Sequence, residues 1–121
     1  MIIRKIQDDT LSFYDGEQPV LIIQETDIPD GVLMSLKGAL RSDLTHHIQD
    51  ELDAFITVGI HVTLDFQEVS YVSASVLLAL IDSQQLVDYL RKGKILLKNI
   101  PAEVYQEMNR SGASEELLIE R

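Results

Sequence analysis

The stretch LDFQEVSYVSASVLLALI, residues 64–81, leads from an apparent strand through small residues directly into an apolar helix. In the overlapping segment IHVTLDF, residues 60–66, apolar and polar side chains alternate, which is the pattern of a half-buried strand. After the small residues, apolar side chains recur at helical spacing as far as Gly93, which is a suitable helix stop. Residues 73–75 are therefore predicted to connect the end of a strand to the N-terminus of a helix.

The segments before this junction predict a hairpin and a helix. VLIIQ and VLMSLK, residues 20–24 and 32–37, have strand composition, and a Pro-Asp-Gly turn joins them, so they should pair antiparallel. A helix should follow, with Ser42 or Asp43 as its N-cap and Gly59 as its stop. Its inward stripe is predicted from the apolar residues Leu44, Ile48, Leu52 and Phe55.

The segments after the junction predict a strand, a helix and a short last element. KILLKNI, residues 94–100, is typical of a strand, and Pro101 is well placed to start a helix that Gly112 ends. Residues 116–120 suit a last strand or a short helix. The order β-β-α-β-α-β-α predicts an α/β fold, a single domain with a mixed β-sheet and helices packed on it. We expect the domain to cover residues 19–121, and residues 1–18 to be an N-terminal extension that forms an extra hairpin or a partly ordered arm.

Composition excludes several classes of function. The chain has 121 residues, enough for one domain, and its 20 acidic and 10 basic residues give a net charge of -10. This balance argues against nucleic acid and against anionic membranes, since both are bound through Lys and Arg. The absence of cysteine excludes disulfides and thiolate chemistry. Because neither a signal peptide nor an apolar membrane span is visible, we expect a cytoplasmic protein.

The histidines and carboxylates do not form a catalytic pattern. His46 and His47 are adjacent on a predicted helix and point about 100° apart, so they cannot face one metal ion together. His61 lies on a strand without ligand-like spacing, and no phosphate loop or nucleophile elbow is present. We therefore expect no catalytic site, cofactor or metal, and a protein that is not an enzyme. An enzyme of unrecognised type would need a cleft with several converging ionisable side chains.

Three segments in register resemble the STAS domain family, which includes anti-sigma factor antagonists. The junction LDFQEVSYVSASVLLALI is similar to the family's signature of an apolar strand followed by a Ser-rich helix start. MSLKGAL is similar to the family's second strand and its Gly-x-Leu turn, and IPAEVYQEMNRSG to its third helix. The resemblance covers about residues 20–121.

This resemblance implies a switchable binding module. Antagonists of the family dock on a kinase-type anti-sigma factor, and phosphorylation of a serine at the start of the second helix breaks that docking. The free N–H groups of a helix start tolerate a phosphate, whereas its charge in an interface repels and is costly to desolvate. The partner implied here is a kinase-type anti-sigma factor or another STAS protein. Association of the domain with copies of itself is a further alternative.

The sequence departs from the family pattern at the switch itself. In the family register Ala74 occupies the phospho-acceptor position, and alanine has no hydroxyl to phosphorylate. Ser73 and Ser75 flank it; they are interpreted as a helix N-cap and a first-turn residue, or as a displaced phosphosite. Val76 replaces a usual glycine, and Arg41 replaces a common aspartate on the expected partner face.

The resemblance places the partner-binding surface at the starts of the first two helices. Small-ligand sensing, or a non-phosphorylatable scaffold role in a signalling complex, is the alternative function on the same fold. The residues predicted to form this surface are Arg41, Ser42, Asp43, Ser73, Ala74, Ser75 and Val76.

Overall fold

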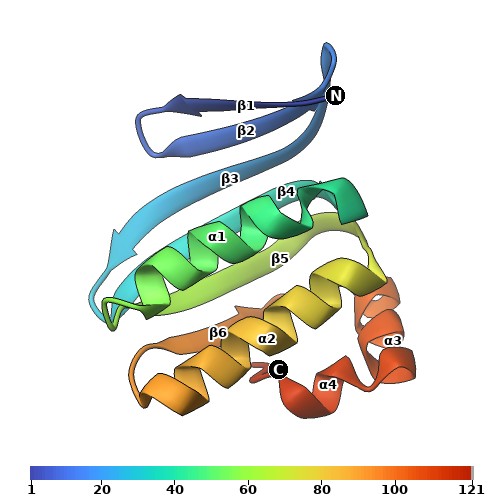
Figure 1. The fold of residues 1–121 in the computed structure, drawn as a ribbon. Helices are drawn as coiled ribbons and strands as arrows, with labels where there is room; N and C mark the ends of the chain where they lie inside the picture. Colours follow the sequence, from blue (N-terminus) through green and yellow to red (C-terminus); the bar gives the residue numbers. More distant parts are fainter. Residues whose placement is uncertain (121) are drawn as a thin grey trace.

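A six-stranded mixed sheet is the centre of the fold, and two long helices lie side by side on it (Figure 1). The computed structural model describes residues 1–120. The elements are β1 Ile2–Gln7, β2 Thr10–Asp15, β3 Gln18–Ile28, β4 Gly31–Leu40, a 3-10 turn η1 at Ser42–Leu44, α1 Thr45–Ile56, β5 His61–Val72, α2 Ala74–Leu90, β6 Lys94–Lys98, α3 Ala102–Ser111 and α4 Ala113–Glu116.

The strands lie in the sheet in the order of the sequence. β1 to β4 form an antiparallel meander, while β4, β5 and β6 pair in parallel. Parallel neighbours need a crossover connection, and α1 and α2 provide the two that this sheet requires. The predicted α/β fold with a mixed sheet and packed helices is confirmed.

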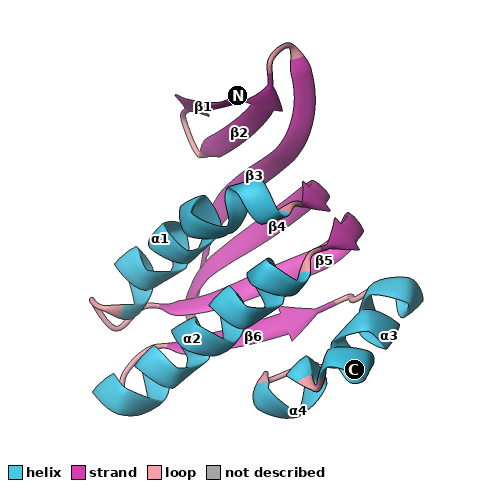
Figure 2. Cartoon of the chain, turned by 45° about the vertical axis from the view of Figure 1, so that its right-hand side comes forward, coloured by secondary structure: helices cyan, strands magenta, loops and turns pink. Residues whose placement is uncertain are grey.

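The core lies between one face of the sheet and the helices α1 and α2 (Figure 2). Alternate residues of the strands point into it, as in β5, where Val62, Leu64 and Phe66 are buried. In α1 the buried stripe ends at Ile56, whereas Phe55, predicted to point inward, is only partly buried. Ile56 lies four residues after Leu52 and so continues the row at the same helical spacing.

The first residues of the chain extend the sheet. β1 and β2 form an antiparallel hairpin in which Ile3 lies opposite Tyr14, and β2 pairs with β3. Leu11 and Phe13 of β2 are buried in the core beneath the helices. Of the two forms considered for residues 1–18, the structure therefore shows the extra hairpin. The division of the chain after residue 18 stays a prediction.

Several boundaries and caps differ from the expectations. Neither Ser42 nor Asp43 caps α1 with its side chain, because a 3-10 turn comes first. β5 continues to Val72, well beyond the predicted strand. Arg91 ends α2 in the left-handed conformation (φ 56°), two residues before the predicted Gly93 stop.

The chain beyond α3 closes onto the edge of the sheet. Gly112 ends α3 as predicted, and the one-turn α4 follows. Ile119 then forms a parallel bridge with Leu97 of β6, so this segment contains both a short helix and a strand contact. Arg121, the last residue of the expected domain, lies outside the described residues. None of the helices in residues 1–120 has the length and apolar character needed to cross a membrane.

Candidate functional site

Two helix starts lie next to each other at one edge of the sheet. β4 leads through Arg41 and η1 into α1, and β5 leads through Ser73 into α2. Because β4 and β5 are parallel neighbours, their carboxyl ends meet at the same edge. The backbone N–H of Ser73 donates to the carbonyl oxygen of Leu40 at 3.0 Å and joins the two connections. We call the surface formed by Arg41, Ser42, Asp43, Ser73, Ala74 and Ser75 the junction surface.

A chain of hydroxyl groups crosses from α2 to η1. The Ser73 Oγ accepts from the Val76 N–H at 3.2 Å and lies 3.1 Å from the Ser75 Oγ. The Ser75 Oγ lies 2.9 Å from the Thr45 Oγ1, which donates to the Ser42 carbonyl oxygen at 2.7 Å. Since each hydroxyl has one proton, Thr45 must accept from Ser75, and Ser75 from Ser73.

In this series of hydroxyl groups, every hydroxyl donates its one proton to a neighbouring oxygen atom. Ser73 is 5% exposed and caps α2, which agrees with its interpretation as the N-cap. Ser75 is half-buried and holds the start of α2 against Thr45 of α1. Thr45 was not among the predicted site residues, because its role depends on a neighbour 30 positions away in the sequence.

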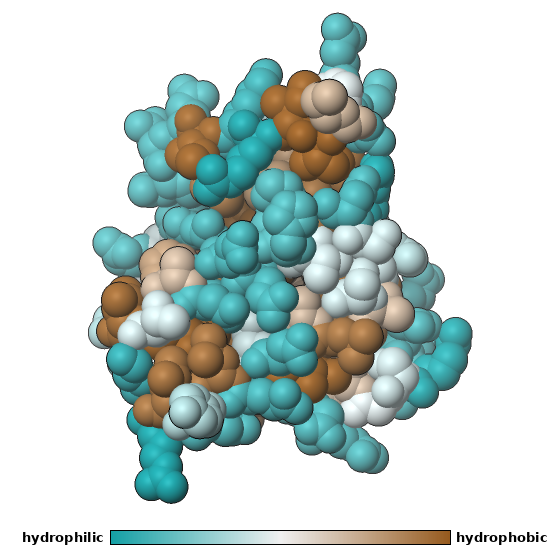
Figure 3. Space-filling view, in the orientation of Figure 1, coloured by the Kyte–Doolittle hydropathy of each residue, from teal (hydrophilic) through white to brown (hydrophobic). Residues whose placement is uncertain are grey.

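Ala74 is the exposed residue between these two serines. It is the first residue of α2, and its methyl group lies at the surface beside buried Ser73. Leu78, one helical turn further along, is 62% exposed, and sequence reasoning did not select it. The sequence feature that could have identified Leu78 is that this leucine falls outside the apolar residues that point inward from α2. Figure 3 shows hydrophobic surface in the region of this helix.

Val76 does not belong to the surface. Its side chain is 0% exposed and packs in the core, so a partner would not meet it. Position 76 therefore tolerates a side chain larger than glycine because that side chain points inward. Tyr71, two residues before Ser73, is 54% exposed.

Arg41 is held by two carboxylates. Its guanidinium donates to both carboxylate oxygens of Asp43, and its Nη2 donates to the Asp15 Oδ2 at 3.1 Å. Hydrogen bonds from the Met1 amino group and then from Arg41 lower the pKa of Asp15. Hydrogen bonds to Asp43 and then to Asp15 raise the pKa of Arg41. The positive charge that distinguishes this position from the family pattern is thus largely offset locally.

A carboxyl pair, Glu25 and Glu51, lies between β3 and α1. Glu25 of β3 has a buried Oε2 atom without a hydrogen-bond partner in residues 1–120. Burial first, then the neighbouring carboxyl of Glu51 and the charge of Asp9, raise the pKa of Glu25 to about 7. Arg4, which lies 3.9 Å from Glu51, opposes this shift. A proton on one carboxyl lets the pair form the missing hydrogen bond.

We expect stability to fall as this proton is lost. The pKa of Glu25 is higher in the folded chain than its ordinary value of 4.5, so the native state binds the proton more tightly. The free energy of unfolding should therefore decrease as the pH rises from about 4.5 to about 7. Glu25→Gln should remove this dependence and stabilise the protein at pH 8 by about 1 kcal/mol, after allowance for solvent screening.

Thermal or urea unfolding between pH 5 and about pH 8 measures this difference. Glu103→Gln, which changes an exposed glutamate of α3, is the control and should leave the pH profile unchanged. A parallel pH profile for wild type and Glu25→Gln would show that Glu25 ionises normally in the folded chain.

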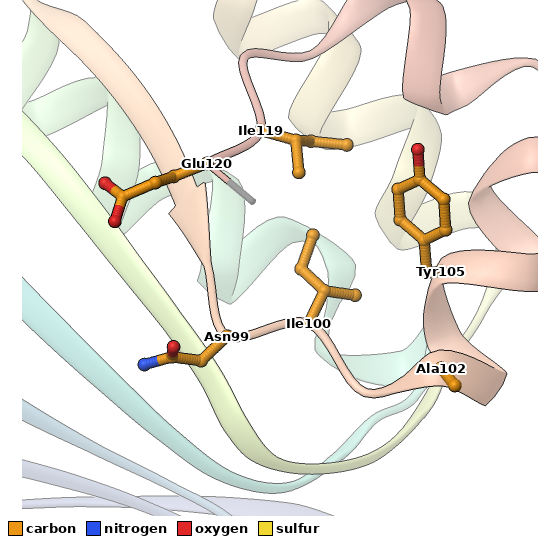
Figure 4. Close-up of a pocket in the computed structure, with 6 residues that line it drawn as sticks. All are labelled: Asn99, Ile100, Ala102, Tyr105, Ile119 and Glu120. Carbon is orange, nitrogen blue, oxygen red and sulfur yellow. The ribbon is translucent and has the colours of Figure 1, made fainter.

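A pocket beside the end of β6, α3 and the C-terminal segment is apolar at its centre (Figure 4). It measures about 400 Å³, and its lining residues are Asn99, Ile100, Ala102, Tyr105, Ile119 and Glu120. Ile100, Ile119 and the ring of Tyr105 face one another, while Asn99 and Glu120 point away from that space. The pocket therefore lacks a converging set of acid and base groups. Within residues 1–120, no three His, Asp or Glu side chains gather as a metal site would need.

The structure is thus an α/β domain in which two neighbouring helix starts lie at one edge of the sheet. The STAS domain family model matches residues 22–121, and the chain belongs to this family. No curated protein sequence matches the chain.

Solved structures of anti-sigma factor antagonists share the fold. SpoIIAA in its unphosphorylated form is 16% identical, with a TM-score of 0.67, covering 82% of this chain and 88% of its own. A putative antagonist from Thermotoga maritima is 13% identical, with a TM-score of 0.66, covering 80% and 84%. A Ser-to-Glu variant of RsbS from Moorella thermoacetica is 18% identical, with a TM-score of 0.63, covering 81% and 85%. At these identities the likeness concerns the fold.

Proposed function

We propose that this STAS domain is a cytoplasmic protein-binding module, not an enzyme, that regulates a signalling partner through its junction surface. The partner is a kinase-type anti-sigma factor or another STAS protein, as for an anti-sigma factor antagonist. The observation that carries the proposal is the exposed Ala74 at the first position of α2, beside exposed Ser42 and Asp43. A small side chain there lets a partner approach the helix start closely.

In this proposal the module lacks the family's phosphorylation switch. Ala74 occupies the acceptor position, and the hydroxyls of Ser73 and Ser75 already donate within the chain that holds the two helix starts together. A phosphate on Ser73 would also have to enter a site that is 5% exposed. The extent of binding would then depend on the concentration of the partner and not on phosphorylation of this domain.

We expect incubation with the cognate kinase and ATP to leave the wild-type protein mostly unmodified. Ala74→Ser should become an acceptor, because it puts a hydroxyl on the exposed first residue of α2. Intact-protein mass spectrometry measures the added phosphate, and peptide fragmentation locates it. Stoichiometric phosphate on wild-type Ser73 or Ser75, with loss of partner binding, would show a switch displaced by one residue.

Recovery of the partner from the native host tests binding itself. A pull-down with the purified domain should retain a kinase-type regulator or another STAS protein without added cofactor. Retention of nucleic acid alone at moderate salt would count against the proposal, since the net charge is -10.

The apolar pocket of Figure 4 supports small-ligand sensing as the second candidate function. Native mass spectrometry of the freshly purified protein would detect a bound small molecule. A ligand that Ile119→Glu releases, with the junction surface unchanged, would favour this candidate. A scaffold role in a larger signalling complex instead predicts several copies per assembly.

A further inference from the structure

One face of the sheet carries no helix in the part of the chain that the structure describes. α1 and α2 lie on the opposite face (Figures 1 and 2). The uncovered residues are those that alternate with the buried ones; Leu33, for example, lies between buried Val32 and Met34 of β4. We call this surface the open face. Parallel strands are normally covered on both sides, whereas the parallel strands here are covered on one.

The centre of the open face is apolar and spans the parallel strands. Leu33 of β4 lies opposite Thr63 of β5, which in turn lies opposite Leu96 of β6. Ile22 of β3 belongs to the same face. All four side chains are half-buried by their neighbours in the sheet, and no helix packs on them. Leu33, Thr63 and Leu96 form a row across the parallel strands on which an apolar helix side can rest, while Ile22, opposite Lys37, lies further along the strands.

Four lysines share the open face with this row. Lys5, Lys37, Lys94 and Lys98 alternate with inward residues of β1, β4 and β6 and so belong to the open face. None of the four takes part in an ion pair within residues 1–120.

Only two carboxylates of the strands share the open face, and they do not balance its lysines. Asp65 and Glu68 of β5 lie opposite Ser35 and Lys37 of β4. Asp65 already accepts from the Gln67 N–H at 2.9 Å. The strands therefore place four lysines and two carboxylates on the open face of a chain whose total charge is -10.

The helical side has the opposite charge. α1 and α2 contain five carboxylates and no Lys or Arg. On the outer stripe of α2, Leu78 and Tyr89 are 62% and 83% exposed, and Asp82 and Asp88 are exposed beside them. An apolar stripe with acidic neighbours matches an apolar row with basic neighbours.

We propose that the open face binds the outer stripe of α2 from a second copy of this chain. The α2 helix of the second copy would cover the parallel strands and complete a helix–sheet–helix arrangement. Because the two surfaces differ, the contact is heterologous and copies add head to tail. The net charge of -10 on each copy opposes approach, so the association is weak and reversible.

The test is a charge exchange measured by analytical ultracentrifugation. Wild type should show an average mass that rises with concentration up to about 1 mM, where even a millimolar contact is half formed. Lys37→Glu/Lys94→Glu should weaken the association at least about tenfold, and Asp82→Lys/Asp88→Lys should do the same, since each makes like charges meet. An equimolar mixture of the two variants should associate again, because every contact between them pairs opposite charges.

The control variant is Lys92→Glu/Arg110→Glu, which changes the net charge as Lys37→Glu/Lys94→Glu does, at exposed positions outside the open face. It should associate as wild type does, and circular dichroism should show all variants folded. A monomeric wild type up to about 1 mM would overturn the proposal. So would undiminished association of either charge-reversed variant, or a mixture that stays monomeric. None of these results depends on the junction surface.

Discussion

Replacing Gly38 with alanine should lower the free energy of unfolding by about 3 kcal/mol. Gly38 lies in β4 with a φ of +123°, a conformation that L side chains rarely adopt. An added Cβ would lie 2.1 Å from the carbonyl oxygen of Val20 in β3, so the backbone of one strand would have to move. The displacement would occur just before Leu40, whose carbonyl joins the two helix starts.

Gly16→Ala is the matched control for this change. Gly16 also has a positive φ, of +62°, but no atom lies within 4 Å of an added Cβ. Its cost should be about 1 kcal/mol, from the backbone conformation alone. Urea unfolding of both variants separates the two contributions. Equal losses would show that β3 yields to the added methyl group with little cost.

The second large effect concerns Ala74. Ala74→Asp should weaken partner binding about a hundredfold, because an unpaired charge would be desolvated in the interface. A negative side chain at the first residue of a helix is favourable for the helix dipole, so the domain itself should stay folded. The affinity loss would then report the interface and not unfolding. Isothermal titration against the partner recovered from the host measures it.

Ala102→Asp controls for charge and for helix position. Ala102 is also an exposed first residue, that of α3, and it is not one of the residues that form the junction surface. It should bind the partner as wild type does. If both variants bind equally well, the start of α2 lies outside the interface.

Local patterns were sufficient to predict the fold class. Alternation in residues 60–66 and the apolar spacing of α2 each require only near neighbours in the sequence. The same reasoning gave Ser73 as a helix N-cap, and in the structure Ser73 caps α2. It failed at the start of α1, where Ser42 is part of a 3-10 turn. At that start a hydroxyl contact joins Thr45 to Ser75, and no local pattern contains this contact.

The candidate site was predicted in position but not in detail. The resemblance selected Ala74, which is exposed, and also Val76, which is fully buried. Because α2 is apolar on most sides, its sequence does not show which side faces the sheet. For the same reason, the exposure of Leu78 and the charge of the open face became apparent only from the packed structure.

Amide chemical-shift mapping by NMR tests the central claim most directly. The isotopically labelled domain is titrated with its unlabelled partner, and the perturbed backbone amides are located on the fold. We predict the largest changes at Ser42 and Asp43 and along the first turn of α2, from Ala74 to Leu78. Changes confined to the open face or to the pocket at Tyr105, with these amides unaffected, would contradict docking through the junction surface.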